Sequence, residues 1–139
     1  MICYFDASAF VKLVIPEPGS VQAADLWSDA DRVASSYVLY PEARSALARA
    51  DRSRRMGRHR GRQARRLLEA FWLDVDGIAP AARIVNRAGD LADEQALRAL
   101  DAVHLASAEE IAGRDVVLVA GDGALCAAAR HIGFTVAEV

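Results

Sequence analysis

The chain has 139 residues, 53% of them hydrophobic, which suits one domain that buries a core without disulfide or metal support. The formal net charge is only −2, but sixteen of the seventeen basic residues are arginines, and eight of these lie between Arg52 and Arg66. Cys3 and Cys126 are too few and too distant for a disulfide scaffold or a zinc site, so we expect buried free thiols. Without a leader pattern or a bilayer-length apolar run, the sequence predicts a cytoplasmic protein with no membrane contact.

The chain begins with an apolar run, residues 1–6, that ends in the carboxylate of Asp6 and passes directly into a helical pattern. A short run rich in β-branched and aromatic residues predicts a buried parallel strand. Ligands of open α/β sheets gather beyond the carboxyl ends of the strands, which makes Asp6 a first candidate for a functional site. Asp6 could also simply cap the following helix, and taken alone that is the simpler interpretation.

Helical and strand patterns then alternate along the rest of the chain. We predict helices over residues 8–14, 20–28 with Ser20 as the cap, a long segment from 36, then 63–73, 81–92, from about 101, and 124–130. The predicted strands are 32–35, 75–79, 116–120 and 134–137. Residues 52–62 are expected to form a turn and 93–95 a frayed helix end. One face of the fourth helix, which is either core, as we favour, or a subunit contact, carries Leu67, Leu68, Phe71 and Trp72. This order predicts a single domain, 1–139, with a three-layer α/β/α fold and a central, mostly parallel sheet of about five strands.

Four acids occupy the first turn of a predicted helix or the residue before it: Asp6, Glu42, Asp101 and Asp122. Each alone can be explained as a helix cap. If the sheet brings them together, two unit charges about 4 Å apart repel by about 4 kcal/mol at an effective dielectric constant of about 20. Protonation could relieve that repulsion, and so could a hard divalent cation such as Mg²⁺ or Mn²⁺, which prefers oxygen ligands. Because such an ion activates water and stabilises charge on a phosphoryl group, the pattern favours a metal-dependent phosphodiesterase.

Four segments resemble the PIN-domain ribonucleases, and more narrowly the VapC toxins of bacterial toxin–antitoxin pairs: residues 4–13, 40–47, 100–108 and 121–125. The resemblance covers nearly the whole chain in order and spacing. It implies a PIN-like nuclease that binds one or two Mg²⁺ or Mn²⁺ ions and cleaves RNA endonucleolytically. It also implies a cognate antitoxin that blocks the acidic pocket, and a homodimer.

The resemblance assigns roles to individual residues. It implies catalytic and metal-binding roles for Asp6, Glu42, Asp101 and Asp122, and a supporting role beside the first acid for Ser8. One position departs from the family, because Ala120 stands where relatives often carry Thr or Ser. A catalytically weak or inactive PIN-like module that binds RNA or protein is therefore the alternative function.

The remaining polar residues of interest each have two interpretations. His104 is either a general base or, as its apolar neighbours favour, a packed core histidine. Arg58, Arg60, Arg62 and Lys12 could contact RNA phosphates, which would make binding steeply dependent on salt. A solvated helical hairpin, and for Lys12 a solvated helix position, explain these charges equally well. Since no aromatic residues are interleaved with the arginines, we expect phosphate contact rather than base stacking.

Overall fold

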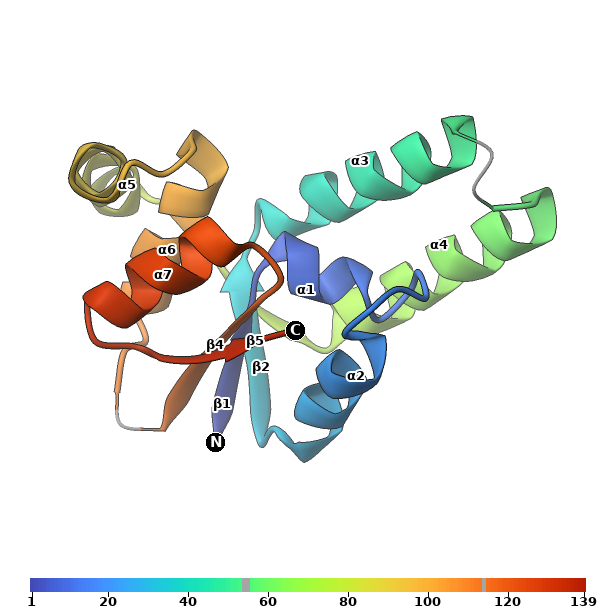
Figure 1. Ribbon diagram of the computed structural model, residues 1–139, viewed down its shortest axis with the longest axis horizontal. Helices are drawn as coiled ribbons and strands as arrows, with labels where there is room; N and C mark the ends of the chain where they lie inside the picture. Colours follow the sequence, from blue (N-terminus) through green and yellow to red (C-terminus); the bar gives the residue numbers. More distant parts are fainter. Residues whose placement is uncertain (54–55, 114) are drawn as a thin grey trace.

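The computed structural model describes residues 1–53, 56–113 and 115–139 and contains one parallel five-stranded sheet in the order β3-β2-β1-β4-β5 (Figure 1). The strands are β1 (Ile2–Phe5), β2 (Arg32–Ser36), β3 (Val75–Ile78), β4 (Val116–Ala120) and β5 (Thr135–Glu138). The helices of the described residues are α1 (Ala7–Val11), α2 (Ser20–Asp29), α3 (Leu39–Arg52), α4 (Arg58–Leu73), α5 (Ala82–Gln95), α6 (Ala99–Glu109) and α7 (Gly123–His131). The prediction of about five mostly parallel strands is confirmed.

Helices cover both faces of the sheet, because successive side chains of β1 point to opposite sides. Tyr4 joins the apolar core beneath α5, α6 and α7, whereas Cys3 and Phe5 join the core beneath α1 and α2. Figure 1 shows α6 and α7 on one side of the sheet and α2 on the other. The predicted three-layer α/β/α architecture is therefore confirmed, and both Cys3 and Cys126 are buried free thiols as expected.

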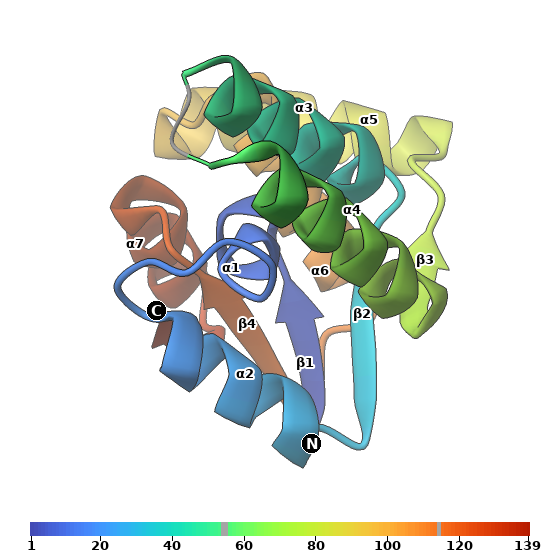
Figure 2. The same ribbon diagram turned by 90° about the vertical axis from the view of Figure 1, so that its right-hand side faces the viewer.

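Helices α3 and α4 form a hairpin that extends beyond the sheet (Figures 1 and 2). Its inner faces bury Leu39, Leu47 and Leu68 against Phe10 of α1. Trp27 and Phe71 meet edge to face with ring centroids 5.0 Å apart and extend this apolar cluster to α2. The hairpin is thus held at its base by the residues that follow β1.

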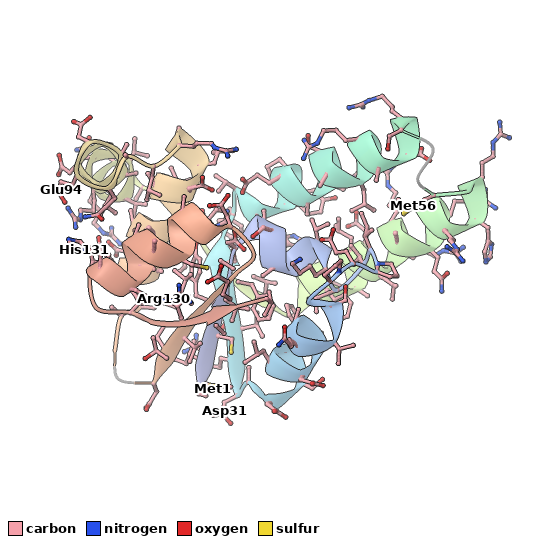
Figure 3. All side chains as sticks on the ribbon, in the orientation of Figure 1. Met1, Asp31, Met56, Glu94, Arg130 and His131 are labelled. Atoms are coloured by element: carbon pink, nitrogen blue, oxygen red, sulfur yellow. The ribbon has the colours of Figure 1, made fainter. Side chains whose placement is uncertain are left out.

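The strand order creates a topological switch point between β1 and β4. From β1 the chain builds the sheet outward to β2 and β3, and it then returns to add β4 and β5 on the other side. The carboxyl ends of β1 and β4 therefore flank a crevice from which the connections diverge, which is where open α/β sheets bind ligands. At the opposite, amino-terminal edge the Met1 ammonium forms an ion pair with Asp31, and both are labelled in Figure 3.

Several predicted boundaries were wrong. Ser36 ends β2 instead of starting a helix, because it pairs with Ile78 of β3, and α3 begins at Leu39. The N-cap of α2 is Gly19 at a φ of 91°, not Ser20, whose hydroxyl instead bonds within the preceding loop. The predicted fraying of residues 93–95 does not occur, since α5 continues to Gln95.

The turn predicted over residues 52–62 was too long, because its last residues belong to a helix. Arg54 and Arg55 lie outside the described residues, but α4 already begins at Arg58, five residues earlier than expected, because arginine and glutamine are good helix formers. The core interpretation of the α4 face is confirmed for Leu68, Phe71 and Trp72, whereas Leu67 is 39% exposed and Ala64 is buried in its place. None of the helices in the described ranges combines the length and hydropathy needed to span a membrane.

Candidate active site

Asp6 lies at the carboxyl end of β1, where it caps α1. Its Oδ1 accepts a hydrogen bond from the Ala9 amide at 2.9 Å, and the Ser8 hydroxyl lies 2.8 and 2.7 Å from its two carboxylate oxygens. The Ser8 Oγ in turn accepts from the Gly121 amide at 2.7 Å, immediately after β4. Ser8 therefore joins the ends of the two strands that flank the switch point, and the capping interpretation of Asp6 is confirmed alongside its position at this edge.

Asp6 is only 3% exposed, and burial raises the pKa of its carboxyl group because the charged form loses solvation. The hydrogen bonds that Ala9 and Ser8 donate to Asp6 act in the opposite direction. They offset part of the cost that burial imposes on the ionised carboxylate.

Glu42 lies in the first turn of α3 and contacts α6 through His104. The two atoms that meet, Glu42 Oε2 and His104 Nε2, are 2.6 Å apart. The other ring nitrogen of His104, Nδ1, lies 2.9 Å from the Tyr4 hydroxyl of β1, which accepts a hydrogen bond from the Ser36 amide at 3.1 Å. His104 is 1% exposed, so the prediction of a packed core histidine is confirmed, but its two polar contacts were missed.

Asp101 and Asp122 complete the acidic edge. Asp101 lies in the first turn of α6, and Asp122 caps α7 by accepting from the Leu125 amide at 3.0 Å. Burial raises the pKa of the Asp101 carboxyl group, and the negative charges of Asp122 and Glu42 raise it further. Asp101 therefore lies close enough to Asp122 and Glu42 for their negative charges to act on its carboxyl group.

The donor chemistry of this edge suits a hard divalent cation. It offers carboxylate oxygens, which Mg²⁺ and Mn²⁺ prefer, and the mutual repulsion that raises the pKa of Asp101 is what a cation would relieve. The side chains are not arranged as a ready-made ligand set, because no three His, Cys, Asp or Glu residues of the described ranges are grouped so that they could hold one ion. The residues present therefore fit such an ion in kind, without an assembled site.

The predicted basic contacts divide into two groups. Arg58 and Arg62 line a hollow of about 560 Å³ between α3 and α4, whereas Arg60 and Lys12 line a larger hollow of about 1210 Å³ between α3, α4 and the α1–α2 loop. Met56, labelled in Figure 3, lines both. The solvated interpretation of Lys12 is wrong, since its side chain is 14% exposed and its Nζ donates to the Pro18 carbonyl at 2.7 Å.

Two further observations concern residues that sequence reasoning treated differently. Ala120 is fully buried at the end of β4, so this chain has no hydroxyl group at that position beside the acidic edge. Tyr4 was not predicted to be a functional residue, although it lies two residues before Asp6. For His104 the sequence did offer a signal, because its three-residue spacing from Asp101 places both side chains on one face of a helix.

The comparisons with known proteins agree with this geometry. The family model described as PIN domain matches residues 3–135, so the chain belongs to the PIN-domain family. The chain is also 41% identical over 136 residues to Ribonuclease VapC45 of Mycobacterium tuberculosis (strain CDC 1551 / Oshkosh), covering 98% of this chain and 94% of that protein. Within the PIN family it is therefore a VapC-type member, as the resemblance predicted.

Solved structures support the same fold. The chain superposes on Mycobacterium tuberculosis VapC20, a sarcin-ricin loop cleaving toxin, with a TM-score of 0.70 at 22% identity, covering 99% of this chain and 98% of that one. It also superposes on a chain of a toxin-antitoxin complex from Klebsiella pneumoniae, with a TM-score of 0.59 at 20% identity and 86% coverage of both chains. These likenesses show the architecture.

Proposed function

We propose that this protein is a metal-dependent endoribonuclease, the toxin of a toxin–antitoxin pair, formed by a single PIN-like nuclease domain over residues 1–139. The proposal is supported by the positions of four acids, at the end of β1, in the first turns of α3 and α6 and at the N-cap of α7, in a VapC-type chain: Asp6, Glu42, Asp101 and Asp122. A relative that shares 41% of its residues is named a ribonuclease, which supports RNA as the substrate.

The proposed partners follow from the same relatives. A structural neighbour is part of a toxin-antitoxin complex, which supports a cognate antitoxin for this chain. The homodimer and the cytoplasmic location stay predictions. RNA is the proposed substrate, with Arg58, Arg60, Arg62 and Lys12 as candidate contacts to its phosphates.

In the proposed mechanism Asp6, Glu42, Asp101 and Asp122 would hold one or two Mg²⁺ or Mn²⁺ ions. Such an ion lowers the pKa of a bound water and neutralises charge on the phosphoryl oxygens. The chain's own groups fix the carboxylates: Ser8 and the Ala9 amide hold Asp6, the Leu125 amide holds Asp122, and His104 holds Glu42. Fixed donors lower the reorganisation that the transition state would otherwise require.

The test is RNA cleavage by the purified protein with Mg²⁺ or Mn²⁺, compared with the same protein in chelator. We expect cleavage that needs the cation and that is lost in Asp6→Asn and in Asp101→Asn. Asp76→Asn is the matched control, because Asp76 is an exposed carboxylate that pairs with Arg32 on β2, away from the acidic edge. Cleavage that survives chelation or survives either active-edge substitution would contradict the metal-nuclease mechanism. Binding of RNA without any cleavage would favour the inactive module instead.

A further inference from the structure

The buried contact between His104 and Glu42 is the last link in a longer chain of hydrogen bonds. It begins at the Ser36 amide, passes through the Tyr4 hydroxyl and the His104 ring, and ends at Glu42 Oε2. Its atoms come from β2, β1, α6 and α3. The described residues leave none of its buried polar atoms without a partner.

The direction of this chain follows from its last member. A carboxylate only accepts, so the His104 Nε2 that lies 2.6 Å from Glu42 Oε2 carries a proton and donates it to the carboxylate. In a neutral imidazole Nδ1 is then the acceptor and faces the Tyr4 hydroxyl at 2.9 Å, while the Tyr4 oxygen accepts from the Ser36 amide. The chain therefore holds one oxygen of Glu42 through a donated hydrogen bond.

We propose that Tyr4 and His104 are positioning residues that fix the Glu42 carboxylate for divalent-cation binding. Glu42 is the proposed ligand with the longest side chain, and its side chain remains 20% exposed, so packing alone does not immobilise it. His104 removes that freedom at one oxygen and leaves Oε1 without a donor among the residues that the structure describes. This inference rests on the proposed function, because it assigns Glu42 to the cation site.

Partners that orient a metal ligand typically contribute 10–100-fold to metal affinity. We therefore expect His104→Leu to weaken Mn²⁺ binding by about tenfold, measured by isothermal titration calorimetry or by the electron paramagnetic resonance of free Mn²⁺. His104→Gln, whose amide can still donate to Glu42, should recover most of that loss. Tyr4→Phe keeps the packing of the ring but removes the hydroxyl, and should weaken binding by about fivefold, as expected for one buried hydrogen bond.

A purely structural histidine would behave differently, and two controls separate the cases. Cys3→Ala removes another buried polar side chain of β1, one that packs on the opposite face of the sheet and contacts the Leu26 carbonyl, and should leave Mn²⁺ affinity unchanged. In a Glu42→Gln background the effect of His104→Leu should disappear, because residues that act through one another are not additive. Circular dichroism confirms that each variant is folded before titration, and Tyr4→Phe provides the same test if His104→Leu does not fold.

The outcomes distinguish this inference from the proposed function. Wild-type affinity in folded His104→Leu or Tyr4→Phe, or a loss that persists in full in the Glu42→Gln background, would overturn the positioning role alone. Absence of Mn²⁺ binding by the wild-type protein would overturn the proposed function together with it.

Discussion

The carboxyl edge of the sheet and the α3–α4 hairpin are two charged regions that are built in opposite ways. At the edge, Asp6 is buried and is fixed by hydrogen bonds from Ser8 and Ala9. On the hairpin, Arg58 and Arg62 are exposed and line the hollow between α3 and α4. Fixed groups suit chemistry that needs a defined geometry, whereas exposed charges suit attraction of a charged partner. The two regions should therefore control different steps.

The largest effect is expected at the carboxyl edge, where a substitution should slow RNA cleavage while RNA binding changes little. Asp101→Asn should lower the rate constant of RNA cleavage by about 100-fold or more, since it removes a proposed ligand of the cation that would activate water. The dissociation constant for RNA should change by less than about threefold, because a carboxylate does not attract phosphate. Single-turnover cleavage and a filter-binding assay in chelator measure the two quantities. A variant that loses binding as strongly as cleavage would break the division between the regions.

Ser8→Ala should have the next largest effect. Its hydroxyl is the one side-chain link between the Asp6 carboxylate and the Gly121 amide, so the substitution frees one acid and leaves a backbone donor unpaired. We expect about tenfold slower cleavage, in line with the loss of a group that orients a metal ligand. Ser28→Ala, which removes an exposed hydroxyl of α2, should cleave at the wild-type rate. Equal rates for the two variants would remove Ser8 from the site.

The sequence predicted the edge better than the hairpin, and the reason is physical. Acids that end strands or begin helices in a βα pattern must gather at one end of a parallel sheet, so Asp6 and Asp122 could be placed from their neighbours alone. The bond from Tyr4 to His104 spans 100 residues and depends on which side chains face each other across β1 and α6. Helix periodicity carries no information about such a contact.

The hairpin was mispredicted for a different reason. Charged residues and glycines between Arg52 and Arg62 are typical of turns, yet arginine also favours helices, and tertiary packing of Leu68 and Ala64 decided the outcome. Gly61 lies inside α4, where an added Cβ atom would meet the Asp51 side chain of α3 at an ordinary contact distance, so this glycine marks neither a turn nor a close approach. Composition alone could not reveal that it lies within a helix.

A smaller effect is expected on the hairpin, and it should appear in binding only. Arg58→Gln combined with Arg62→Gln removes two charges from one hollow, and should reduce the slope of log affinity against log salt by about 1.4 for single-stranded RNA. The single substitution Arg60→Gln tests the larger hollow. The rate constant of cleavage at saturating RNA should be unchanged. All binding measurements use the Asp101→Asn background so that the RNA stays intact.

The matched control for the hairpin is Arg83→Gln combined with Arg87→Gln. These arginines lie on α5 and pair with Glu110 and Glu109 of the neighbouring helix segment. They change the net charge by the same amount as the hairpin pair. If both pairs flatten the salt dependence equally, RNA responds to the overall charge of the protein and the hairpin has no special role.

The smallest effect is expected on the thermal stability of the metal-free protein. It contrasts Asp101 at the carboxyl edge of the sheet with Asp31 at the amino-terminal edge. Burial and the charges of Asp122 and Glu42 raise the pKa of Asp101, so the folded protein keeps this proton after the unfolded chain has lost it. Stability must then fall as pH rises from about 4 through the raised pKa. Asp101→Asn removes that cost and should raise the Tm at pH 7.5 by roughly 2–3 °C, with no gain near pH 3.5.

Asp31 at the amino-terminal edge should show the opposite sign. The Met1 ammonium lowers the pKa of the Asp31 carboxyl group, so its contribution to stability is present at neutral pH and is lost as pH falls through the lowered pKa. Asp31→Asn should therefore lower the Tm slightly at pH 7.5, by a small amount because the pair is exposed. Thermal melts of both variants in chelator, and again with Mn²⁺, measure this contrast.

Mn²⁺ should stabilise the wild-type protein and not Asp101→Asn, because a ligand stabilises only the folded form that binds it. Equal stabilisation of both would mean that Asp101 does not contribute to cation binding.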